Sequence, residues 1–395
     1  MEAVAWLDSV KRGRSARDGR LLERAQRTLM GNLLEPAPGT DFPWSPYRGI
    51  APSPGHYQGV WNWDAAFHAR TVARWDPALA REQVRLFLRF QQQTGQLPDV
   101  VYANGTTVTR FGKPPIFPWA CVRIDEIQAD DAFLAAVYPA FKRYEAFWRS
   151  ERSREGLFFY DSLCRDEARR EVEAKYESGW DTSVRWDLGI TRLWPVDLNV
   201  YMVMVYGALA RMAGRLSLEE EAAAWRKSGA DLGDLVRQRF WSDRGASFFD
   251  VNQDSKRPTY VHSPASFMPL YAGIATAEQA RRVADLAADP ARFFPGMPTV
   301  SYDHPEYASS DYWRGPTWLN AAYFALKGLR RYGHGDLADS MREQLLDGCD
   351  REGESIFEYY DSRSGKGAGA RSFGWSAAFV IEFILDWDGA EGPGT

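Results

Sequence analysis

Residues 130–151 read DDAFLAAVYPAFKRYEAFWRSE, and this stretch decides the fold class. Its apolar side chains recur at i, i+3, i+4 and i+7 while charged ones occupy the other face, which is the pattern of an amphipathic helix. The same spacing recurs over 17–34, 77–92, 197–213, 217–240, 276–288, 316–332 and 335–347. Helices therefore dominate the predicted structure.

Helix starts are indicated by side chains able to cap exposed N–H groups, namely Asp76 before a proline, Asp197, Ser217 and Thr276. Strand signals are confined to short runs at 98–102 and 156–160, which predict small hairpins. No βαβ alternation appears, so a parallel sheet is not expected.

The loops between the helices are long and rich in Gly, Pro, Trp and Tyr; they span 36–63, 93–118, 156–196, 242–262, 290–316 and 353–375. Loops of this length are usually functional, and their regular recurrence predicts that they project from one rim of a closed all-α toroid of about twelve helices. No repeated motif supports an open solenoid. Because no linker divides the chain, we predict one domain over 1–387 and a mobile tail over 388–395.

Composition limits the partners of this 395-residue chain. Hydrophobic residues make up 45% and charged residues 26%, as in a globular protein with a large core. The net charge of −5 gives no basic excess, so nucleic acid and anionic membranes are disfavoured. We expect a small neutral or weakly charged partner, while composition fixes no oligomeric state.

Cysteine usage indicates a reducing, cytoplasmic setting. Cys121, Cys164 and Cys349 are odd in number and widely spaced, so they form neither a disulfide framework nor a CxxC knuckle. The first 20 residues lack the apolar core of a signal peptide, and no stretch reaches the roughly 20 apolar residues of a membrane span. Histidines and cysteines are too scattered for a zinc or iron site; calcium in an acidic loop stays open, and we predict no cofactor.

Aromatic residues are abundant, with 16 Trp, 18 Tyr and 22 Phe, and many lie in loops beside Gly, Pro, Asp or Arg. Aromatic rings stack on the C–H faces of sugars, so this placement favours a carbohydrate site. The alternative is that a wide helical core uses the rings for packing.

Residues 176–187, YESGWDTSVRWD, place three carboxylates among two tryptophans and one arginine. A carboxylic acid held among aromatic rings is desolvated, and its pKa rises toward the value that a general acid needs. Asp181 is the best candidate for this role, with Trp180 beside it as a substrate contact. The alternative is that Asp181 caps a helix or pairs with Arg185 at i+4.

A second acidic motif lies within residues 354–375, where Glu358 precedes two tyrosines and a glycine-rich turn, followed by Trp375. A second carboxylate across the pocket from the first would deprotonate a water for attack on the anomeric carbon. The alternative is that Glu358 is a surface residue beside the loop.

Two further segments pair aromatic and polar residues. Residues 59–68, GVWNWDAAFH, supply Trp61, Trp63, Asp64 and Phe67, and residues 311–320, DYWRGPTWLN, supply Trp313 and Arg314. An aspartate accepts hydrogen bonds from two ring hydroxyls while an aromatic ring covers the sugar, and these segments provide both parts. Alternatively, the aspartate caps a helix and the arginine pairs with Asp311.

These segments together resemble the signatures of glycoside hydrolase family 63 and its trehalase-like relatives. The matching motifs are WNWD at 61–64, ESGWDTSVRW at 177–186, YWRGPTW at 312–318, and EYY at 358–360 with FGWSAA at 373–378. They span residues 60 to 380 in the expected order. Within that group the chain is most similar to the small bacterial mannosylglycerate and glucosylglycerate hydrolases, since it lacks room for an extra β-domain.

The resemblance implies an (α/α)6 barrel and an inverting glycoside hydrolase with Asp181 as general acid and Glu358 as general base. Their carboxyls are then expected about 6.5–9.5 Å apart, whereas roughly 5 Å would indicate retention. Sugar-binding residues implied by the resemblance are Trp61, Asp64, Arg185, Trp313 and Trp375. The chain is shorter than the family at its N-terminus and lacks recognisable aglycone-loop residues, so the glycerate part is less supported.

Two other functions fit the same scaffold, because fold does not fix function. A sugar epimerase would need a histidine acid/base pair, but the five histidines, at 56, 68, 262, 304 and 334, lie outside both acidic motifs. A non-catalytic carbohydrate-binding protein would have no need of both Asp181 and Glu358. Hydrolysis of a small α-glucosyl or α-mannosyl compound is therefore the preferred prediction.

Overall fold

The computed structural model describes residues 2–34 and 43–388. Its described part contains the helices α1 (Glu2–Lys11), α2 (Ala16–Gly31), α3 (Asn62–Val72), α4 (Pro77–Arg89), α5 (Phe117–Ile127), α6 (Asp131–Glu151), α7 (Glu167–Ser178), α8 (Val196–Arg215), α9 (Glu219–Arg239), α10 (Met268–Tyr271), α11 (Ala277–Ala288), α12 (Leu319–Arg331), α13 (Gly335–Arg351) and α14 (Gly374–Leu385). Short 3-10 turns lie at Val184–Trp186, Ile190–Arg192 and Pro264–Phe267.

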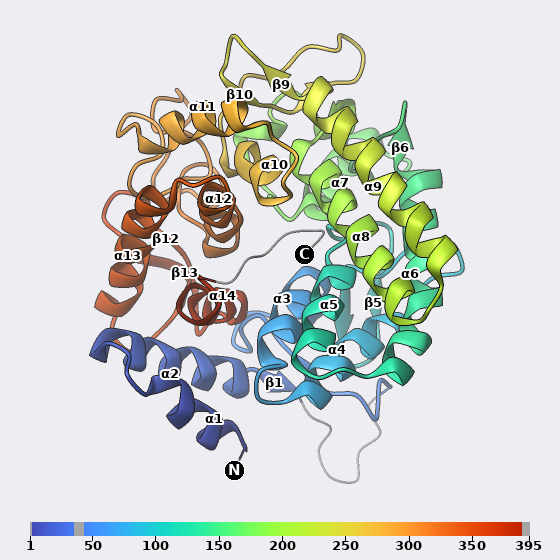
Figure 1. Ribbon diagram of the computed structural model, residues 1–395, viewed down its shortest axis with the longest axis vertical. Coiled ribbons are helices and arrows are strands. Elements are labelled where there is room, and N and C mark those ends of the chain that lie inside the picture. Colours follow the sequence, from blue (N-terminus) through green and yellow to red (C-terminus); the bar gives the residue numbers. More distant parts are fainter. Residues whose placement is uncertain (1, 35–42, 389–395) are drawn as a thin grey trace.

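Twelve of these helices form two concentric rings, as Figure 1 shows. The inner helices contact one another in a closed circle, α3 to α5, α8, α10, α12, α14 and back to α3. In chain order they alternate with the outer helices α2, α4, α6, α9, α11 and α13. This alternation is an (α/α)6 barrel, so the predicted all-α toroid is confirmed.

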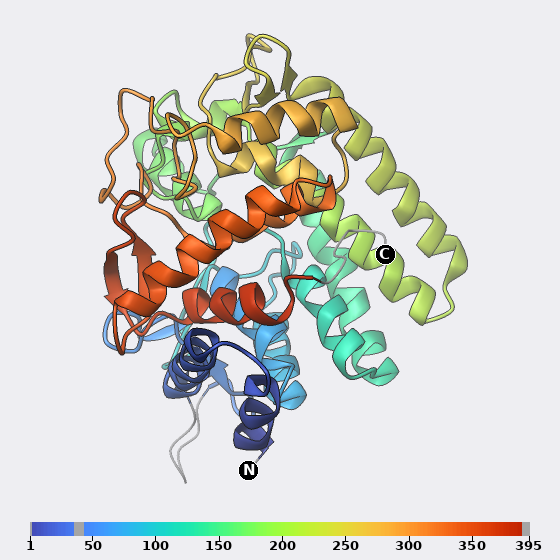
Figure 2. The ribbon, with the colours of Figure 1, turned by 60° about the vertical axis from the view of Figure 1, so that its left-hand side comes forward.

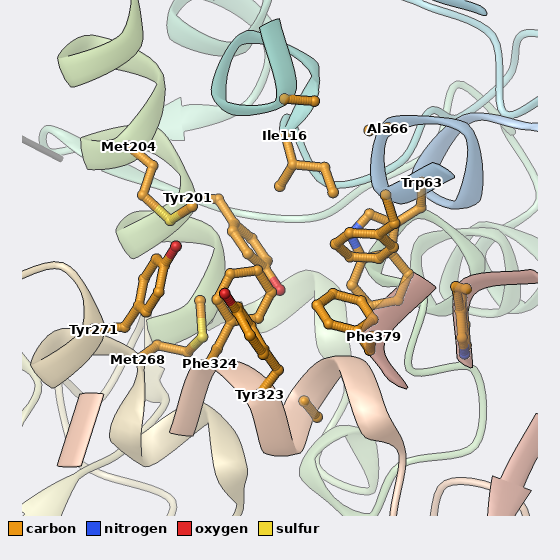
Figure 3. Packing of buried hydrophobic residues seen from close by; sticks show 14 of the residues in the cluster. Trp63, Ala66, Ile116, Tyr201, Met204, Met268, Tyr271, Tyr323, Phe324 and Phe379 are labelled. Atoms are coloured by element: carbon orange, nitrogen blue, oxygen red, sulfur yellow. The ribbon is translucent and has the colours of Figure 1, made fainter. Parts of the chain in front are cut away.

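The two rings differ in which sides of their helices are buried. Every residue of α3 and all but the last of α14 are buried, whereas α2 and α4 bury one face and expose the other. Each inner helix, or the residue just before it, contributes to an aromatic and aliphatic core across the barrel axis; Figure 3 labels Trp63, Ile116, Tyr201, Met268, Tyr271, Tyr323 and Phe379 among others. Burial of apolar surface from both rings stabilises the barrel.

Two of the four predicted caps are confirmed. Asp76 accepts a hydrogen bond from the N–H of Leu79, and Thr276 forms a capping box with Gln279. The prediction for Asp197 is wrong, because α8 begins one residue earlier and this carboxylate binds an arginine. The prediction for Ser217 is also wrong, since Leu218 occupies the N-cap position of α9 without a side-chain bond.

Short strands connect the helices in small antiparallel sheets. They are β1 (Leu33–Leu34), β2 (Gly49–Ile50), β3 (Gly59–Trp61), β4 (Val100–Tyr102), β5 (Thr107–Val108), β6 (Ser153–Arg154), β7 (Leu157–Phe158), β8 (Leu193–Trp194), β9 (Trp241–Ser242), β10 (Ser247–Phe248), β11 (Val251–Asn252), β12 (Phe357–Tyr360) and β13 (Gly367–Arg371). The two predicted strand runs correspond to β4 and β7. In Figure 2 the β12–β13 hairpin and the loops around residues 160–190 and 295–315 lie at one end of the barrel.

The predicted tail, 388–395, lies outside the described residues except for Asp388. The single domain over 1–387 stays a prediction. Among the described helices, none has the length and apolar character needed to cross a membrane.

Candidate active site

A glycine turn at the end of α7 positions Asp181. The helix stops at Ser178, and Gly179 follows with a φ of +74°, in the left-handed region that favours glycine. A Cβ atom at this position would lie 2.5 Å from Cζ3 of Trp63, so only glycine fits against the ring. The turn therefore brings Trp180 and Asp181 next to the first turn of α3.

Asp181 follows this turn. The residue is partly exposed, but its Oδ1 atom is buried and has no hydrogen-bond partner among the described residues. Burial raises the pKa of the Asp181 carboxyl, the ammonium of Lys113 opposes the rise, and the charge of Glu358 adds to it. A carboxyl that holds its proton and has a free oxygen is suited to donate that proton to a ligand.

An irregularity in the β12–β13 hairpin positions Glu358. The pairing register shifts between Phe357 and Tyr359, so Glu358 stands where the ladder is interrupted. The residue is only 5% exposed, which excludes the alternative of a surface residue. Gly369 on β13 leaves room for the carboxylate, because a Cβ atom there would lie 2.6 Å from Oε2 of Glu358.

Three donors hold the carboxylate of Glu358. The hydroxyls of Tyr57 and Tyr312 donate to Oε1 at 3.1 and 3.3 Å, and the N–H of Ala370 donates to Oε2 at 2.9 Å. Burial raises the pKa of Glu358, and these hydrogen bonds work against that rise because they stabilise the ionised form. The group is thus a fixed carboxylate of raised basicity.

Asp181 and Glu358 lie in the same site. Their charges affect common groups. The charge of Glu358 raises the pKa of Asp181, and both carboxylates raise the pKa of Tyr312. The next residue along the chain, Trp313, donates its backbone N–H to the hydroxyl of Thr182 at 3.3 Å. This bond joins the Asp181 motif to segment 311–320, whose Tyr312 hydroxyl donates to Glu358, although 177 positions separate the two carboxylates in the sequence.

Asp64 is a third buried carboxyl in the site. It does not cap α3, whose N-cap residue is Trp61. The residue is 5% exposed, and its Oδ1 has no partner within the described part of the chain. Burial, against the opposing charge of Lys113, raises the pKa of Asp64 to about 8. The side chain can therefore both donate to and accept from a ligand hydroxyl at neutral pH.

Five tryptophans from the motifs that carry these carboxyls and from segment 311–320 pack against one another. Trp313 stacks on Trp318 with ring centroids 3.9 Å apart and an interplanar angle of 7°, and Trp180 covers Trp313 at 4.8 Å. Trp375 meets Trp63 edge-on at 5.4 Å. The indole N–H groups of Trp63, Trp180 and Trp375 are buried without partners among the described residues. A polar ligand would satisfy such donors while the rings cover its apolar faces.

Trp61 lies at the outer side of the site. It is half-buried at the end of β3 and meets Tyr57 edge-on at 5.0 Å and Tyr102 at 5.8 Å. Since Tyr57 also binds Glu358, this ring contacts the shell around the second carboxylate. Its contact with a sugar stays a prediction.

The structure places Phe67 among core side chains, which argues against the predicted sugar contact. The ring is 1% exposed and packs on Phe379, Phe324 and Trp119 with centroid distances of 4.7, 6.4 and 6.3 Å. It also touches Trp63 and Trp375 from the core side. Phe67 is thus a support below the tryptophans, because it lies one turn deeper in α3.

Arg185 forms a buried ion cluster with Asp197 and Asp250, so the alternative in which it pairs with Asp181 is wrong. Its guanidinium donates to Asp197 at 2.6 Å and to both oxygens of Asp250 at 2.9 and 2.8 Å. It lies against the rings of Trp180 and Trp186, at 4.8 and 4.3 Å. This arrangement gives Arg185 a supporting role beneath Trp180, and direct sugar binding stays a prediction.

Arg314 is held by two ion pairs. Its guanidinium pairs with Asp187 at 2.9 Å and Glu306 at 3.1 Å, so the expected alternative pairing with Asp311 is wrong. It also donates to the carbonyl of Thr182 at 3.2 Å, next to Asp181. These bonds fix the loop that carries the acid, while ligand binding by Arg314 stays a prediction.

Several residues of the site were not predicted individually from the sequence: Tyr57, Asp99, Lys113, Tyr312 and Trp318. Tyr312 and Trp318 lie inside a quoted motif but carried no separate signal. Lys113 did carry a signal in the sequence, because it is the only charged residue in the apolar stretch 111–120. A charge in such a stretch requires a buried partner, which is Asp99 at 3.4 Å.

The described ranges contain no cluster of three or more His, Cys, Asp or Glu side chains arranged to hold a metal ion. Cys121, Cys164 and Cys349 are all free.

Comparison with known proteins is consistent with this site. Residues 57–376 match the family model described as the mannosylglycerate hydrolase MGH1-like glycoside hydrolase domain. A mannosylglycerate hydrolase from Rubrobacter radiotolerans is 24% identical over 88% of this chain and 95% of its own length.

Two solved structures share the fold. The mannosylglycerate hydrolase of glycoside hydrolase family 63 from Thermus thermophilus, in complex with Tris and D-glycerate, has a TM-score of 0.76 and 21% identity, covering 91% of this chain and 99% of that one. Neutral trehalase from Saccharomyces cerevisiae has a TM-score of 0.71 and 18% identity, covering 93% and 80%.

Proposed function

The chain belongs to the mannosylglycerate hydrolase MGH1-like glycoside hydrolases and is thus an O-glycosyl hydrolase; from this premise we propose that it cleaves a small α-glucosyl or α-mannosyl compound with inversion and without a metal. One observation carries the proposal. Asp181 and Glu358 share a tryptophan-walled site in different environments: Asp181 keeps a buried oxygen without a partner in the described chain, whereas Glu358 is held by three donors. Such a difference separates an acid from a base.

In the proposed reaction, protonated Asp181 gives its proton to the glycosidic oxygen as the bond from that oxygen to the anomeric carbon breaks. Ionised Glu358 takes a proton from a water molecule, whose oxygen attacks the anomeric carbon from the opposite face. The products are a free sugar of inverted anomeric configuration and the released alcohol. Proton exchange with solvent then restores both carboxyl groups.

The attacking water is proposed to reach Glu358 from the side of β13. A cavity of about 670 Å³ is lined by His56, Gly369 and Arg371, and a Cβ atom on Gly369 would lie 2.6 Å from Oε2 of Glu358. Inversion needs the base to deliver water to the face opposite the acid.

Sugar recognition is proposed to involve the partnerless buried groups of the site. Asp64 and the indole N–H groups of Trp63, Trp180 and Trp375 would bind ring hydroxyls, since each otherwise leaves a buried polar atom unpaired among the described residues. Trp61 and Trp313 would contribute ring surface.

The candidate substrates are mannosylglycerate, glucosylglycerate and α-linked disaccharides such as trehalose. Relatives named mannosylglycerate hydrolase and trehalase support this range. We propose the cytoplasm as the compartment, which the three free cysteines support.

A substrate screen with two variants tests the proposal. Purified protein is incubated with mannosylglycerate, glucosylglycerate, trehalose, kojibiose and nigerose, and free sugar is measured. Release from at least one compound by the natural protein, and loss of release in Asp181→Ala and Glu358→Ala with thermal midpoints nearly unchanged, is the expected result. Interconversion of free sugars without release would support an epimerase instead, and binding without any conversion would support a carbohydrate-binding protein.

A further inference from the structure

Lys113 is a buried ammonium beside the proposed acid, and no motif in the sequence predicts a role for it. It lies in the loop before α5, and its side chain is 11% exposed. Its Nζ atom lies 3.4 Å from Oδ1 of Asp99 and donates to the carbonyl of Tyr176 at 2.5 Å. A buried cation is costly unless it is paired and hydrogen-bonded, so this placement demands a reason.

The first consequence of this placement is mechanical. Tyr176 lies in the last turn of α7, five residues before Asp181. The residue before Lys113, Gly112, donates its N–H to Oε1 of Glu177 on the same turn at 3.1 Å. Residues 112 and 113 thus hold the helix end from which the Gly179 turn and Asp181 follow.

The second consequence is electrostatic. The ammonium faces three carboxyls, Asp99, Asp181 and Asp64, and its charge favours the ionised form of each. The charge of Asp181 raises the pKa of Asp99, and because two like charges disfavour each other's ionisation, Asp99 opposes the effect of the ammonium. An ammonium has three N–H donors; Tyr176 and Asp99 account for two, which leaves one for the site.

We propose that Lys113 is a positioning residue for Asp181: its ammonium fixes the end of α7 and supplies the positive charge that lets Asp181 release its proton, while Asp99 moderates that charge. The inference rests on the proposed function, because it needs Asp181 to be the acid. Without Lys113, burial and the nearby Glu358 would leave Asp181 too weak an acid to protonate a poor leaving group.

The charges that surround Asp181 determine how its titration responds. Lys113 acts on it from the loop before α5, while Asp99, in the loop before β4, and Asp64, in α3, share that ammonium. Glu358 acts on it from β12, and the Tyr312 hydroxyl, which donates to Glu358, is affected by both carboxylates. Removing the ammonium shifts the Asp181 titration to higher pH, and neutralising Asp99 shifts it to lower pH.

The test compares two leaving groups in Lys113→Gln, Lys113→Met and Asp99→Asn. One substrate is the best glycoside from the screen, and the other is the α-glycosyl fluoride of the same sugar, whose small leaving group needs little proton donation. For Lys113→Gln we expect kcat for the glycoside to fall about 10–100-fold, part of the usual contribution of a general acid, and kcat for the fluoride to fall less than about threefold. Lys113→Met also loses the bond to Tyr176 and should fall further.

The pH profile gives the second readout. The alkaline limb of kcat/KM for the glycoside should move to higher pH in Lys113→Gln and to lower pH in Asp99→Asn, a pair of opposite shifts that a structural role would not produce. Lys327→Gln is the matched control: this buried lysine donates to the carbonyls of Asp386 and Trp387 in the core, and its loss should leave the limb in place.

Each outcome either supports or overturns the inference about Lys113. Equal losses for both substrates, or an unmoved limb in both Lys113→Gln and Asp99→Asn, would overturn the inference; Asp99→Asn alone decides it if the lysine variants do not fold. The proposed function is tested separately by Asp181→Asn. If that variant cleaves the glycoside at the natural rate, the acid assignment itself fails. If it loses only the glycoside reaction while Lys113→Gln loses neither, the inference alone fails.

Discussion

A Cβ atom placed on Gly179 would lie 2.5 Å from Cζ3 of Trp63, so the glycine that caps α7 packs closely on a ring of the proposed sugar site. This close approach ties the position of Asp181, two residues later, to the first turn of α3. Because Gly179 also has a φ of +74°, side chains are excluded there both by conformation and by space.

We therefore expect Gly179→Ala to lose about 2–4 kcal/mol of unfolding free energy, from left-handed strain and overpacking together, and most of kcat/KM. Gly13→Ala is the matched control, because Gly13 has a φ of +76° and a Cβ atom added there would meet nothing within 4 Å among the described residues. This control variant should lose about 1 kcal/mol of unfolding free energy in urea denaturation. Its activity in steady-state assays should be unchanged. Equal effects in the two variants would show that contact with Trp63 does not matter.

Replacing the tyrosines that bind Glu358 should move the acidic limb of the pH profile. The hydroxyls of Tyr57 and Tyr312 stabilise ionised Glu358, so Tyr57→Phe or Tyr312→Phe raises its pKa, and the limb of kcat/KM moves to higher pH by about half to one unit. Tyr359→Phe serves as the control, since within the described structure its hydroxyl makes no bond to Glu358. A limb that stays in place in both variants would rule out Glu358 as the group that titrates there.

Glu358→Gln should lower kcat by about 10²–10⁴-fold while leaving the unfolding midpoint nearly unchanged. Glu145→Gln is a matched control, because Glu145 is 2% exposed, accepts a bond from the Tyr206 hydroxyl at 3.1 Å and has a pKa raised by burial, but lies on the outer helix α6. It should keep its turnover. Comparable losses of turnover in the two variants, measured per folded molecule, would mean that the effect of Glu358 is structural.

Arg185→Met tests whether this residue supports the site or binds sugar. The side chain is 1% exposed and pairs with two buried carboxylates, so its removal should cost about 3–5 kcal/mol of stability. We expect kcat/KM per folded molecule to fall less than about tenfold. A large rise in KM at unchanged unfolding free energy would instead identify Arg185 as a sugar ligand.

The outer ring of the barrel could be predicted because its helices have one polar face. The helices α2, α4, α6, α9, α11 and α13 all correspond to predicted amphipathic segments. In contrast, α3, α5 and α14 were not predicted as full helices, since α3 and α14 are buried on all sides and have no polar face to reveal the period. The closure of the inner ring is a tertiary property that no local pattern contains.

Candidate site residues could be named from the sequence where a motif places unlike residues side by side, as at Asp181 and Glu358, whose catalytic roles stay predictions. The site was not predictable where function arises from distant loops. Tyr57 stands in loop 36–63 and Asp99 and Lys113 in loop 93–118, and only the fold brings the Tyr57 hydroxyl to Glu358 and the Lys113 charge to Asp181. The sugar contact of Phe67 stays a prediction; in the structure its ring is 1% exposed and packs on Phe379 and Phe324.

The configuration of the first sugar released tests the central claim most directly. Proton NMR during early hydrolysis of the best α-glycoside from the screen shows which anomer forms before mutarotation. If Asp181 and Glu358 act on opposite faces of the sugar, the β-anomer appears first. Initial release of the α-anomer would contradict the account, because it requires two displacements and therefore a carboxylate acting as nucleophile.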